Sequence, residues 1–361
     1  MPPKTVTWTL DEHTLGKHLV LRAYLDAWLP IMSRFNGRIL FIDGFAGPGE
    51  YAKGEDGSPI IALKALVEHS AKTRIVAEIG FVFIEEDKKR VDHLGKAIGR
   101  VGSLPPNCHV NVFHGRFDQT LSGILDDVDR QAAHLAPSLV MIDPFGVSGT
   151  PMDVVRRIFA SPKSEVLVSL MYEPLNRFLQ TPEYESHLDD LFGSREWRQA
   201  LQIVQPEQRR NFIYGLYSDQ LRNAGAKYVV WFELYEGNRH VYTMFFATQH
   251  RVGCDRMKQA IWKTAPLGNY QFRSNLRNHM ALLSPDFEPL KEALIQEFSG
   301  RGWIDIGQVS DFVASDKTNY HSGQLKSKAL KPLEQEGKLE IDTATRRRNL
   351  TYPDGVRLKF L

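Results

Sequence analysis

Three acidic residues each follow a short apolar segment of the sequence. Asp43 comes after ILFI, Glu85 after GFVFI and Asp143 after SLVMI. Apolar segments of this length are typical of buried parallel strands. Because ligands of open α/β sheets bind beyond the carboxyl ends of the strands, the three carboxylates are predicted to face one site at one edge of a sheet.

The loop after Asp43 reads GFAGPG, which differs from the dinucleotide spacing G-x-G-x-x-G and lacks the G-K-[ST] of phosphate-binding loops. Glycines let the backbone turn sharply against a ligand. An acid followed by glycines suits a pocket for S-adenosylmethionine (SAM), whose ammonium group would face the acid. We therefore predict Asp43, Gly44, Phe45, Gly47 and Gly49 as cofactor-binding residues; the alternative is a structural turn without a ligand.

Two further residues are predicted to border the same cofactor. Glu85 closes the second strand, where the acid of a nucleotide-binding sheet accepts hydrogen bonds from the ribose hydroxyls. The third strand, residues 110–114, leads to Phe117, which either lines the adenine or belongs to an ordinary turn. Before the second strand, Ser58 is expected as the N-cap of a helix and Pro59 as its first residue.

The fourth strand ends in Asp143-Pro144-Phe145, which we predict to be the catalytic motif. Pro144 fixes the backbone, so that Asp143 can be aimed rigidly. A carboxylate accepts the hydrogens of an amine, and an aromatic ring stacks on a base. The motif therefore suits the holding of an exocyclic base amine beside a methyl donor, although Phe145 can also be explained as part of a strand-end turn.

The remaining elements must position these loops. Residues 10–35 are predicted as a helix that Pro30 kinks or interrupts, with Lys17 and His18 on a solvated face. A fifth strand is expected at residues 165–171, and residues 228–235 and 240–248 form a hairpin. The predicted fold is α/β: a SAM-methyltransferase-like (Rossmann-like), mostly parallel sheet with helices on both faces.

The last part of the chain has a different pattern of elements. Residues 285–361 read as helix, short strand, two helices and a hairpin of residues 338–341 with 350–352, the order of a winged helix. Its basic side chains are predicted to contact nucleic-acid phosphates; they are Lys326, Lys328, Lys331, Arg346, Arg347 and Arg348. The alternative is a protein-docking module with solvated charges.

Bulk composition limits the function classes. The 361 residues are predicted to form two domains, 1–284 and 285–361, and the net charge of +2 restricts any nucleic-acid surface to a local patch. Cys108 and Cys254 form no motif for a disulfide or a zinc site, and no metal site is predicted. No apolar segment reaches the roughly 18–20 residues that span a bilayer, so we expect a cytoplasmic protein.

Taken together, these stretches resemble the three-Cys-motif partner (TcmP) family over nearly the whole chain. The matching stretches are KHLVLRAYLDAW, FIDGFAGPGEY, GSP, IDPFG and FFATQHRVGCDRMKQAIW. The resemblance implies a SAM-methyltransferase-like domain with a winged-helix tail, a cofactor loop at Asp43, Gly47 and Gly49, and a substrate motif at Asp143-Pro144-Phe145. It also implies a partner protein that has three cysteines and resembles radical-SAM enzymes.

Three functions follow as hypotheses. The leading one is a SAM-dependent methyltransferase that acts on nucleic acid, on an exocyclic base amine. The second is a non-catalytic or accessory partner that binds SAM or nucleic acid; it is favoured because D-P-F-G has one proline fewer than the D-P-P-[YF] of amino-methyltransferases. The third is a metal-dependent nuclease, since carboxylates at strand ends suit Mg²⁺.

Overall fold

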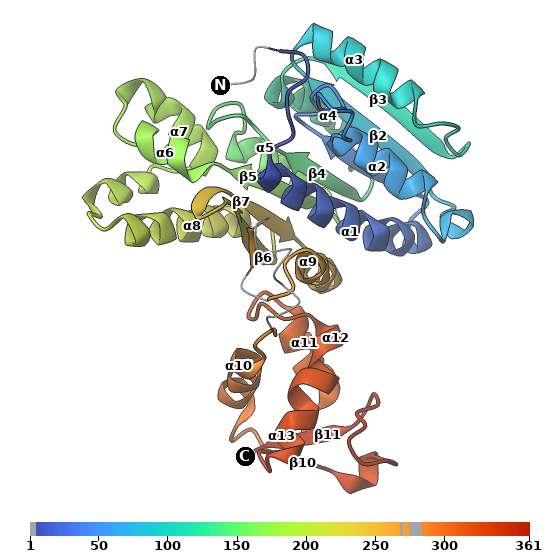
Figure 1. Cartoon of the computed structure of the whole chain (residues 1–361), viewed down its shortest axis with the longest axis vertical. Helices are drawn as coiled ribbons and strands as arrows, with labels where there is room; N and C mark the ends of the chain where they lie inside the picture. The colour runs from blue at the N-terminus through green and yellow to red at the C-terminus, as the bar shows by residue number, and fades with distance from the viewer. Residues whose placement is uncertain (1–4, 268–269, 274–283) are drawn as a thin grey trace.

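The computed structural model describes residues 5–267, 270–273 and 284–361, and a single twisted sheet forms the centre of its larger part (Figure 1). The strand order within these residues is β3-β2-β1-β4-β5-β7-β6-β8. The strands are β1 (Arg38–Asp43), β2 (Glu78–Glu85), β3 (Cys108–His114), β4 (Ser138–Ile142), β5 (Glu165–Leu170), β6 (Tyr228–Glu236), β7 (Arg239–Thr248) and β8 (Gln271–Arg273).

Strands β1 to β5 are parallel, and β7 joins β5 in the antiparallel direction. The hairpin of β6 and β7 forms the antiparallel part of the sheet, and β8, which was not predicted, pairs with β6 in parallel. The predicted α/β fold, a mostly parallel sheet that includes an antiparallel hairpin, is therefore confirmed. Because β1 and β4 are neighbours, their carboxyl ends bring Asp43 and the Asp143 motif to the same edge.

Helices cover both faces of the sheet. One hydrophobic cluster packs α1 (Glu12–Phe35), α2 (Ser58–Val67), α3 (Lys88–Gly99) and α9 (Arg251–Thr264) on one face. A second cluster packs α4 (Phe117–Arg130), α5 (Met152–Phe159), α6 (Tyr172–Phe178), α7 (Glu185–Phe192) and α8 (Pro206–Asn223) on the other. Alternation along β1 explains the division, since Phe41 belongs to the first cluster and Ile42 to the second.

Two details of the predicted helices are wrong. Pro30 does not interrupt α1, which continues through it to Phe35, and a kink at Pro30 stays a prediction. Helix α2 begins one residue earlier than predicted, so Gly57 is its N-cap and Ser58 its first residue. The Ser58 hydroxyl faces the Asp43 carboxylate.

The C-terminal part projects from one end of the α/β body (Figure 1). Its main elements occur in the predicted order. The elements are α10 (Glu288–Phe298), β9 (Ile304–Asp305), α11 (Ile306–Ala314), α12 (Ser322–Gln324), η6 (Leu325–Leu330), α13 (Lys331–Gln335), β10 (Leu339–Ile341), η7 (Thr343–Thr345) and β11 (Arg357–Phe360). The predicted pairing of residues 338–341 with 350–352 is wrong: β10 pairs with β11, because Leu358 and Phe360 alternate on the buried face.

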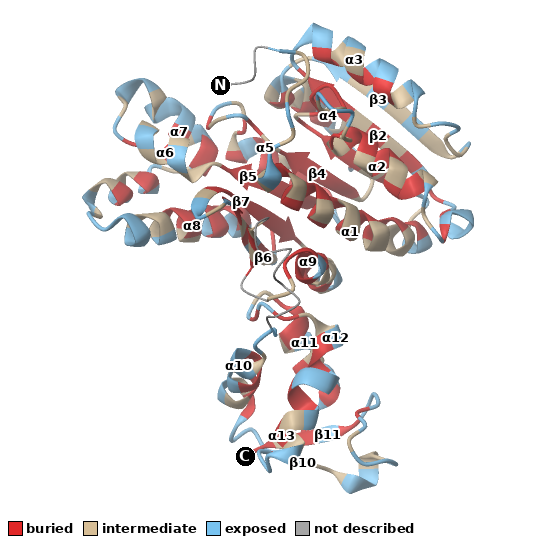
Figure 2. Ribbon diagram, viewed as in Figure 1, coloured by how far each residue is buried: buried red, intermediate tan, exposed pale blue. Residues whose placement is uncertain are grey.

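The junction between the two parts is buried and polar. Lys258 of α9 is fully buried, and its ammonium group donates hydrogen bonds to the carbonyls of Val313, Ser315 and Thr318. Trp262 stacks on Phe287 with the ring centroids 5.6 Å apart. Figure 2 shows buried residues continuing from the sheet into the core of the tail. Within the described segments, no helix has the length and hydropathy needed to cross a bilayer.

Candidate functional site

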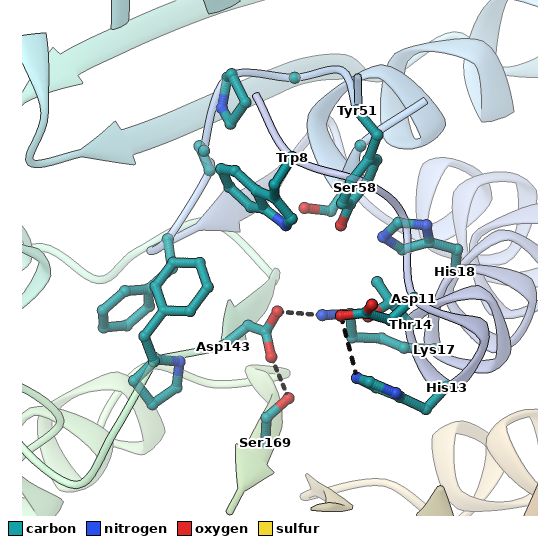
Figure 3. Close-up of a pocket in the computed structure, with 18 of the residues that line it drawn as sticks. Trp8, Asp11, His13, Thr14, Lys17, His18, Tyr51, Ser58, Asp143 and Ser169 are labelled. Atoms are coloured by element: carbon teal, nitrogen blue, oxygen red, sulfur yellow. Dashed lines mark hydrogen bonds and ion pairs between the residues drawn. The ribbon is translucent and has the colours of Figure 1, made fainter. Parts of the chain in front are cut away.

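A cavity of about 170 Å³ opens at the carboxyl edge of the sheet, where α1 passes over β1, β4 and β5. Figure 3 shows that Lys17 and His13 point into it from α1, and that Asp143 and Ser169 face them from the sheet. The glycine loop and the start of α2 form a second wall. Side chains that define the cavity are Trp8, His13, Thr14, Lys17, His18, Phe45, Tyr51, Ser58, Asp143, Pro144, Phe145, Ser169 and Tyr242.

The predicted catalytic acid lies in this cavity, held from two sides. The Lys17 ammonium forms an ion pair with Asp143 Oδ2, and the Ser169 hydroxyl donates to Oδ1. Burial opposes ionisation of Asp143, but Lys17 and Ser169 outweigh it and lower the pKa of the carboxyl. Burial likewise opposes the charge on Lys17, and Asp143 more than offsets it, so the pKa of the amine is raised. Both groups are therefore charged at neutral pH.

Asp43 lies beneath the glycine loop, fully buried. Its Oδ1 accepts a hydrogen bond from the Phe45 amide at 3.1 Å, whereas Oδ2 has no hydrogen-bond partner within the part of the chain that the structure describes. Burial raises the pKa of Asp43 to about 6, against the opposing effect of Ser58 and the Phe45 amide. The carboxylate is thus a buried acceptor with unused hydrogen-bonding capacity.

The glycine loop itself needs glycine at two of the predicted positions. Gly47 and Gly49 have φ values of +62° and +79°, a region that side chains with a Cβ rarely adopt. A Cβ on Gly49 would lie 2.8 Å from Leu94. Gly44 is required for packing instead, because its Cβ would lie 2.2 Å from the Phe117 ring.

Of the predicted cofactor residues, Phe45, Gly47 and Gly49 line the cavity. Asp43, Gly44, Glu85 and Phe117 do not line it. Glu85 Oε2 accepts from the Gly47 amide and Oε1 from the Asp87 amide, each at 2.9 Å. Phe117 is 3% exposed and packs against Gly44 and Phe45. Glu85 therefore fixes the loop through backbone hydrogen bonds, and contacts of either side chain with a nucleoside stay predictions.

Trp8, which the sequence did not single out, closes the cavity from above. Its ring lies edge-on to Tyr51 and to Phe145, with centroids 5.7 Å apart in both pairs. The Arg90 guanidinium lies 5.1 Å from the same ring. The indole is also the nearest group to the open side of Gly47, at 3.7 Å from the position of a Cβ there. The Trp8 ring therefore narrows the cavity beside the glycine loop.

Two histidines of α1 line the cavity with different surroundings. His18 is buried, and burial together with the nearby Lys17 charge lowers its pKa to about 3. His13 is less deeply buried, and burial lowers its pKa below 6.5 despite the opposing charge of Asp11. Both rings are consequently neutral at neutral pH.

The sequence placed Lys17 and His18 on a solvated face, and this expectation is wrong. Lys17 is 6% and His18 5% exposed, because the N-terminal half of α1 lies against the sheet edge instead of in solvent. Ser169 and Tyr242 were missed as well, since an isolated serine or tyrosine within an apolar strand carries no pattern. The position of Lys17 among the apolar residues that α1 buries was the available sign that this lysine is not in solvent.

The predicted basic residues of the tail have different environments. Five of them are exposed: Lys326, Lys328, Lys331, Arg347 and Arg348. Arg346 is not, since its side chain is 7% exposed and forms an ion pair with Glu334 at 2.7 Å. Glu334 also accepts the Tyr352 hydroxyl, so Arg346 belongs to an internal network. Among residues 5–267, 270–273 and 284–361, no three His, Cys, Asp or Glu side chains converge as metal ligands would.

No protein-family model and no curated protein matches this sequence. Solved structures of methyltransferases are similar to it at low identity. Trm1 from Pyrococcus horikoshii in complex with S-adenosyl-L-methionine is 11% identical, over 73% of this chain and 62% of its own, with a TM-score of 0.38.

An O-methyltransferase from Bacillus cereus in complex with SAH is 13% identical, over 66% of this chain and 82% of its own, with a TM-score of 0.33. A SAM-dependent methyltransferase from Agrobacterium tumefaciens is 11% identical, over 66% of this chain and 62% of its own, with a TM-score of 0.35. This chain therefore spans less than two thirds of the Pyrococcus and Agrobacterium proteins.

Proposed function

We propose that the chain is a SAM-dependent methyltransferase that modifies nucleic acid, on an exocyclic base amine. The observation that carries the proposal is the shared cavity, in which the glycine loop after Asp43 faces the Asp143-Pro144-Phe145 motif. Methyl transfer needs the donor and the acceptor to be held in contact and in line. A cofactor loop and an acceptor motif on opposite walls of one cavity meet this requirement.

The residues present suit SAM. Asp43, beneath the turn that Gly47 and Gly49 create, has a buried oxygen with no hydrogen-bond partner among the described residues, and this oxygen would face the ammonium group of the cofactor. When bound, SAM would supply an electrophilic methyl group on sulfur. Glu85 would support this site indirectly, through its hydrogen bond with the Gly47 amide.

The acceptor would be held by the opposite wall. Each oxygen of Asp143 retains a lone pair besides the one used by Lys17 or Ser169, so the carboxylate can still accept the hydrogens of an amine. Phe145 is 38% exposed and would stack on the base. A base within a duplex would have to be flipped out to reach it. The exposed basic residues of the winged-helix-like tail would contact phosphates.

A second function is favoured by one observation, the engagement of both Asp143 oxygens by Lys17 and Ser169. We infer from it the alternative of an accessory protein, a TcmP-type partner that binds SAM or nucleic acid and presents substrate to a radical-SAM-like protein with three cysteines. This alternative requires binding without turnover by the isolated chain.

The test is calorimetric titration of the full chain with SAM, followed by transfer of tritiated methyl groups to DNA and RNA that lack modifications. Asp43→Ala should abolish SAM binding, and Asp92→Ala, which removes an exposed acid of α3, should not. Asp143→Ala should retain SAM binding and lose transfer. Binding without transfer by the unaltered chain would support the accessory function. Absence of SAM binding would contradict the methyltransferase function, and absence of both SAM and nucleic-acid binding would contradict the two functions together.

A further inference from the structure

Lys17 has more hydrogen-bond donors than its contacts with the described residues use. Its side chain is 7% exposed and lines the cavity, and Figure 3 shows the ammonium group directed at Asp143. Among the described residues, Nζ donates one hydrogen bond, to Asp143 Oδ2, and it lies 5.6 Å from the centroid of the Tyr242 ring. Because an ammonium group has three N–H bonds, two donors remain for a ligand.

Asp143 provides an acceptor directly beside this donor. Its side chain is 23% exposed and lines the same cavity. The Ser169 hydroxyl holds Oδ1 and Lys17 holds Oδ2, and each oxygen keeps a further lone pair. The cavity wall therefore presents a donor and an acceptor side by side, in an arrangement that α1, β5 and the end of β4 fix.

Lys17 stays a donor near neutral pH. Burial opposes its charge, but Asp143 more than offsets this effect and raises the pKa of the amine. An ammonium group cannot accept a hydrogen bond, whereas the hydroxyls of Thr14, Tyr51 and Ser58, which also line the cavity, can donate or accept. Lys17 therefore requires a hydrogen-bond acceptor in the part of the ligand that lies against it.

The Watson–Crick edges of the bases differ in the group that adjoins the exocyclic amine. In adenine the amine adjoins ring nitrogen N1, and in cytosine it adjoins N3; both nitrogens are acceptors. In guanine the amine adjoins the N1–H donor, and thymine and uracil have no exocyclic amine. Enzymes that flip a base out of a duplex read this edge by hydrogen bonds. The adjacent donor and acceptor of Lys17 and Asp143 match the edges of adenine and cytosine, and not that of guanine.

We propose that Lys17 determines the base specificity of the acceptor site in favour of adenine and cytosine, a role that rests on the function proposed above. Asp143 would accept a hydrogen of the amine while Lys17 donates to the adjacent ring nitrogen. Guanine would bring its N1–H against the ammonium group and leave two donors unpaired in a buried position, which is costly. The Phe145 ring can stack on any of these bases and does not discriminate between them.

The test supplies the full chain and SAM with oligothymidine and oligouridine that carry one central target base, since their background has no exocyclic amine. Adenine, cytosine or both should be methylated at least about 10-fold faster than guanine. The analogues 1-deazaadenine and 3-deazacytosine keep the amine but have C–H in place of the ring nitrogen, and their kcat/KM should be lower by about 10- to 100-fold. The matched control is 7-deazaadenine, which keeps N1 and should react as adenine does.

A variant tests Lys17 itself. Lys17→Met has no donor, so its ratio of kcat/KM for a base over the deaza analogue of that base should fall to about 1. This ratio compares two substrates on one preparation and does not depend on how much of a less stable variant is folded. The control Lys64→Met, which removes an ion-paired lysine of α2 outside the cavity, should keep the ratio of the unaltered chain.

The outcomes separate this role from the function on which it rests. Equal methylation of each base and its deaza analogue by the unaltered chain, guanine methylated as fast as adenine and cytosine, or an unchanged ratio in Lys17→Met would overturn the role of Lys17 and leave the methyltransferase function in place. SAM binding without transfer to any of these oligonucleotides would overturn both and favour the accessory function. Absence of SAM binding would overturn the methyltransferase function itself.

Discussion

Asp43 illustrates at the scale of one residue how a ligand site conflicts with stability. Its carboxylate is fully buried, one oxygen has no hydrogen-bond partner in the described part of the chain, and burial raises its pKa from 3.8 to about 6. Above this pH the carboxyl is charged in the folded chain, and keeping the charge buried lowers the stability of the fold. Such a group is explained more readily by a bound cation, here the ammonium group of the proposed cofactor, than by the fold.

Asp43→Asn should therefore stabilise the protein while it weakens SAM binding. Between pH 3.8 and about 6 the carboxyl is protonated in the folded chain and ionised in the unfolded one, so unfolding releases a proton. The stability of the unaltered chain therefore falls as the pH rises through this interval. The variant lacks this loss, and its free energy of unfolding should exceed that of the unaltered chain by on the order of 2–3 kcal/mol above pH 6 and by nothing near pH 3.5. Urea titrations at several pH values measure the difference. A constant offset across this range would contradict the explanation.

Lys17 is the counterpart of Asp143, and its removal tests the buried ion pair. Lys17→Met should leave Asp143 as an uncompensated buried charge and lower the free energy of unfolding by about 3–5 kcal/mol. Lys17→Met combined with Asp143→Asn should recover part of this loss, because the charge is removed as well. A double-mutant cycle by chemical denaturation gives the coupling, and additive losses would show that the pair is not coupled.

At the scale of elements, the N-terminal segment before α1 lies against the glycine loop and lines the site. The Trp8 carbonyl accepts a hydrogen bond from the Ala52 amide at 2.8 Å, which ties this segment to the glycine loop. The Trp8 ring then covers Gly47 and narrows the cavity. The segment and the loop therefore form one wall of the cavity together.

Trp8→Ala should increase the rate of SAM association by about tenfold, because the binding-competent open form no longer needs displacement of the indole. Stopped-flow mixing with SAM measures the rate. Trp303→Ala, which removes an exposed tryptophan of the tail, is the matched control and should leave the rate unchanged. A slower association of Trp8→Ala would indicate that the indole helps to hold the ligand.

The helical stretch of the tail from α12 to α13 carries three exposed lysines, at 326, 328 and 331. Replacing all three with glutamate should reduce DNA affinity and the salt dependence of binding, with the slope of log K against log salt smaller by about 2–3. Anisotropy titrations of a labelled duplex measure this. The same replacement of Lys88, Lys89 and Lys96 on α3 keeps the net charge equal and should leave the slope unchanged.

At the scale of the whole molecule, the body and the tail share one hydrophobic core and a buried polar junction. Lys258 donates to three carbonyls at and beyond the end of α11, and Arg251 pairs with Asp311 at 2.5 Å. Backbone carbonyls that lose such a donor in a buried position are costly. The junction therefore fixes the tail to α9.

Lys258→Met should lower the free energy of unfolding by on the order of 3 kcal/mol and reduce the hydrogen-exchange protection of α11. Lys263→Met, an exposed lysine of the same helix, should change the stability by less than about 0.5 kcal/mol. Hydrogen exchange measured by mass spectrometry compares the protection of α11 in the two variants. Unchanged protection of α11 in Lys258→Met would show that the three hydrogen bonds do not hold the junction.

The sequence alone determined the order of the elements and the strand-end motifs. The strands β1 to β5 and the hairpin are where apolar periodicity and glycine-rich turns predict them, because these preferences depend on neighbouring residues. Asp43 and Asp143 could be assigned to one edge, since parallel strands end on the same side. The second strand of the tail hairpin could not be placed, because several short segments compete to pair with β10.

Only the tertiary structure decided what surrounds these motifs. The Lys17–Asp143 ion pair joins residues 126 positions apart, and no local pattern predicts which lysine packs against which strand end. Trp8, His13 and Tyr242 come together because α1, β7 and the N-terminal segment converge on one cavity. Burial, and with it the charge state of each acid and histidine, depends on this packing and not on the residue type.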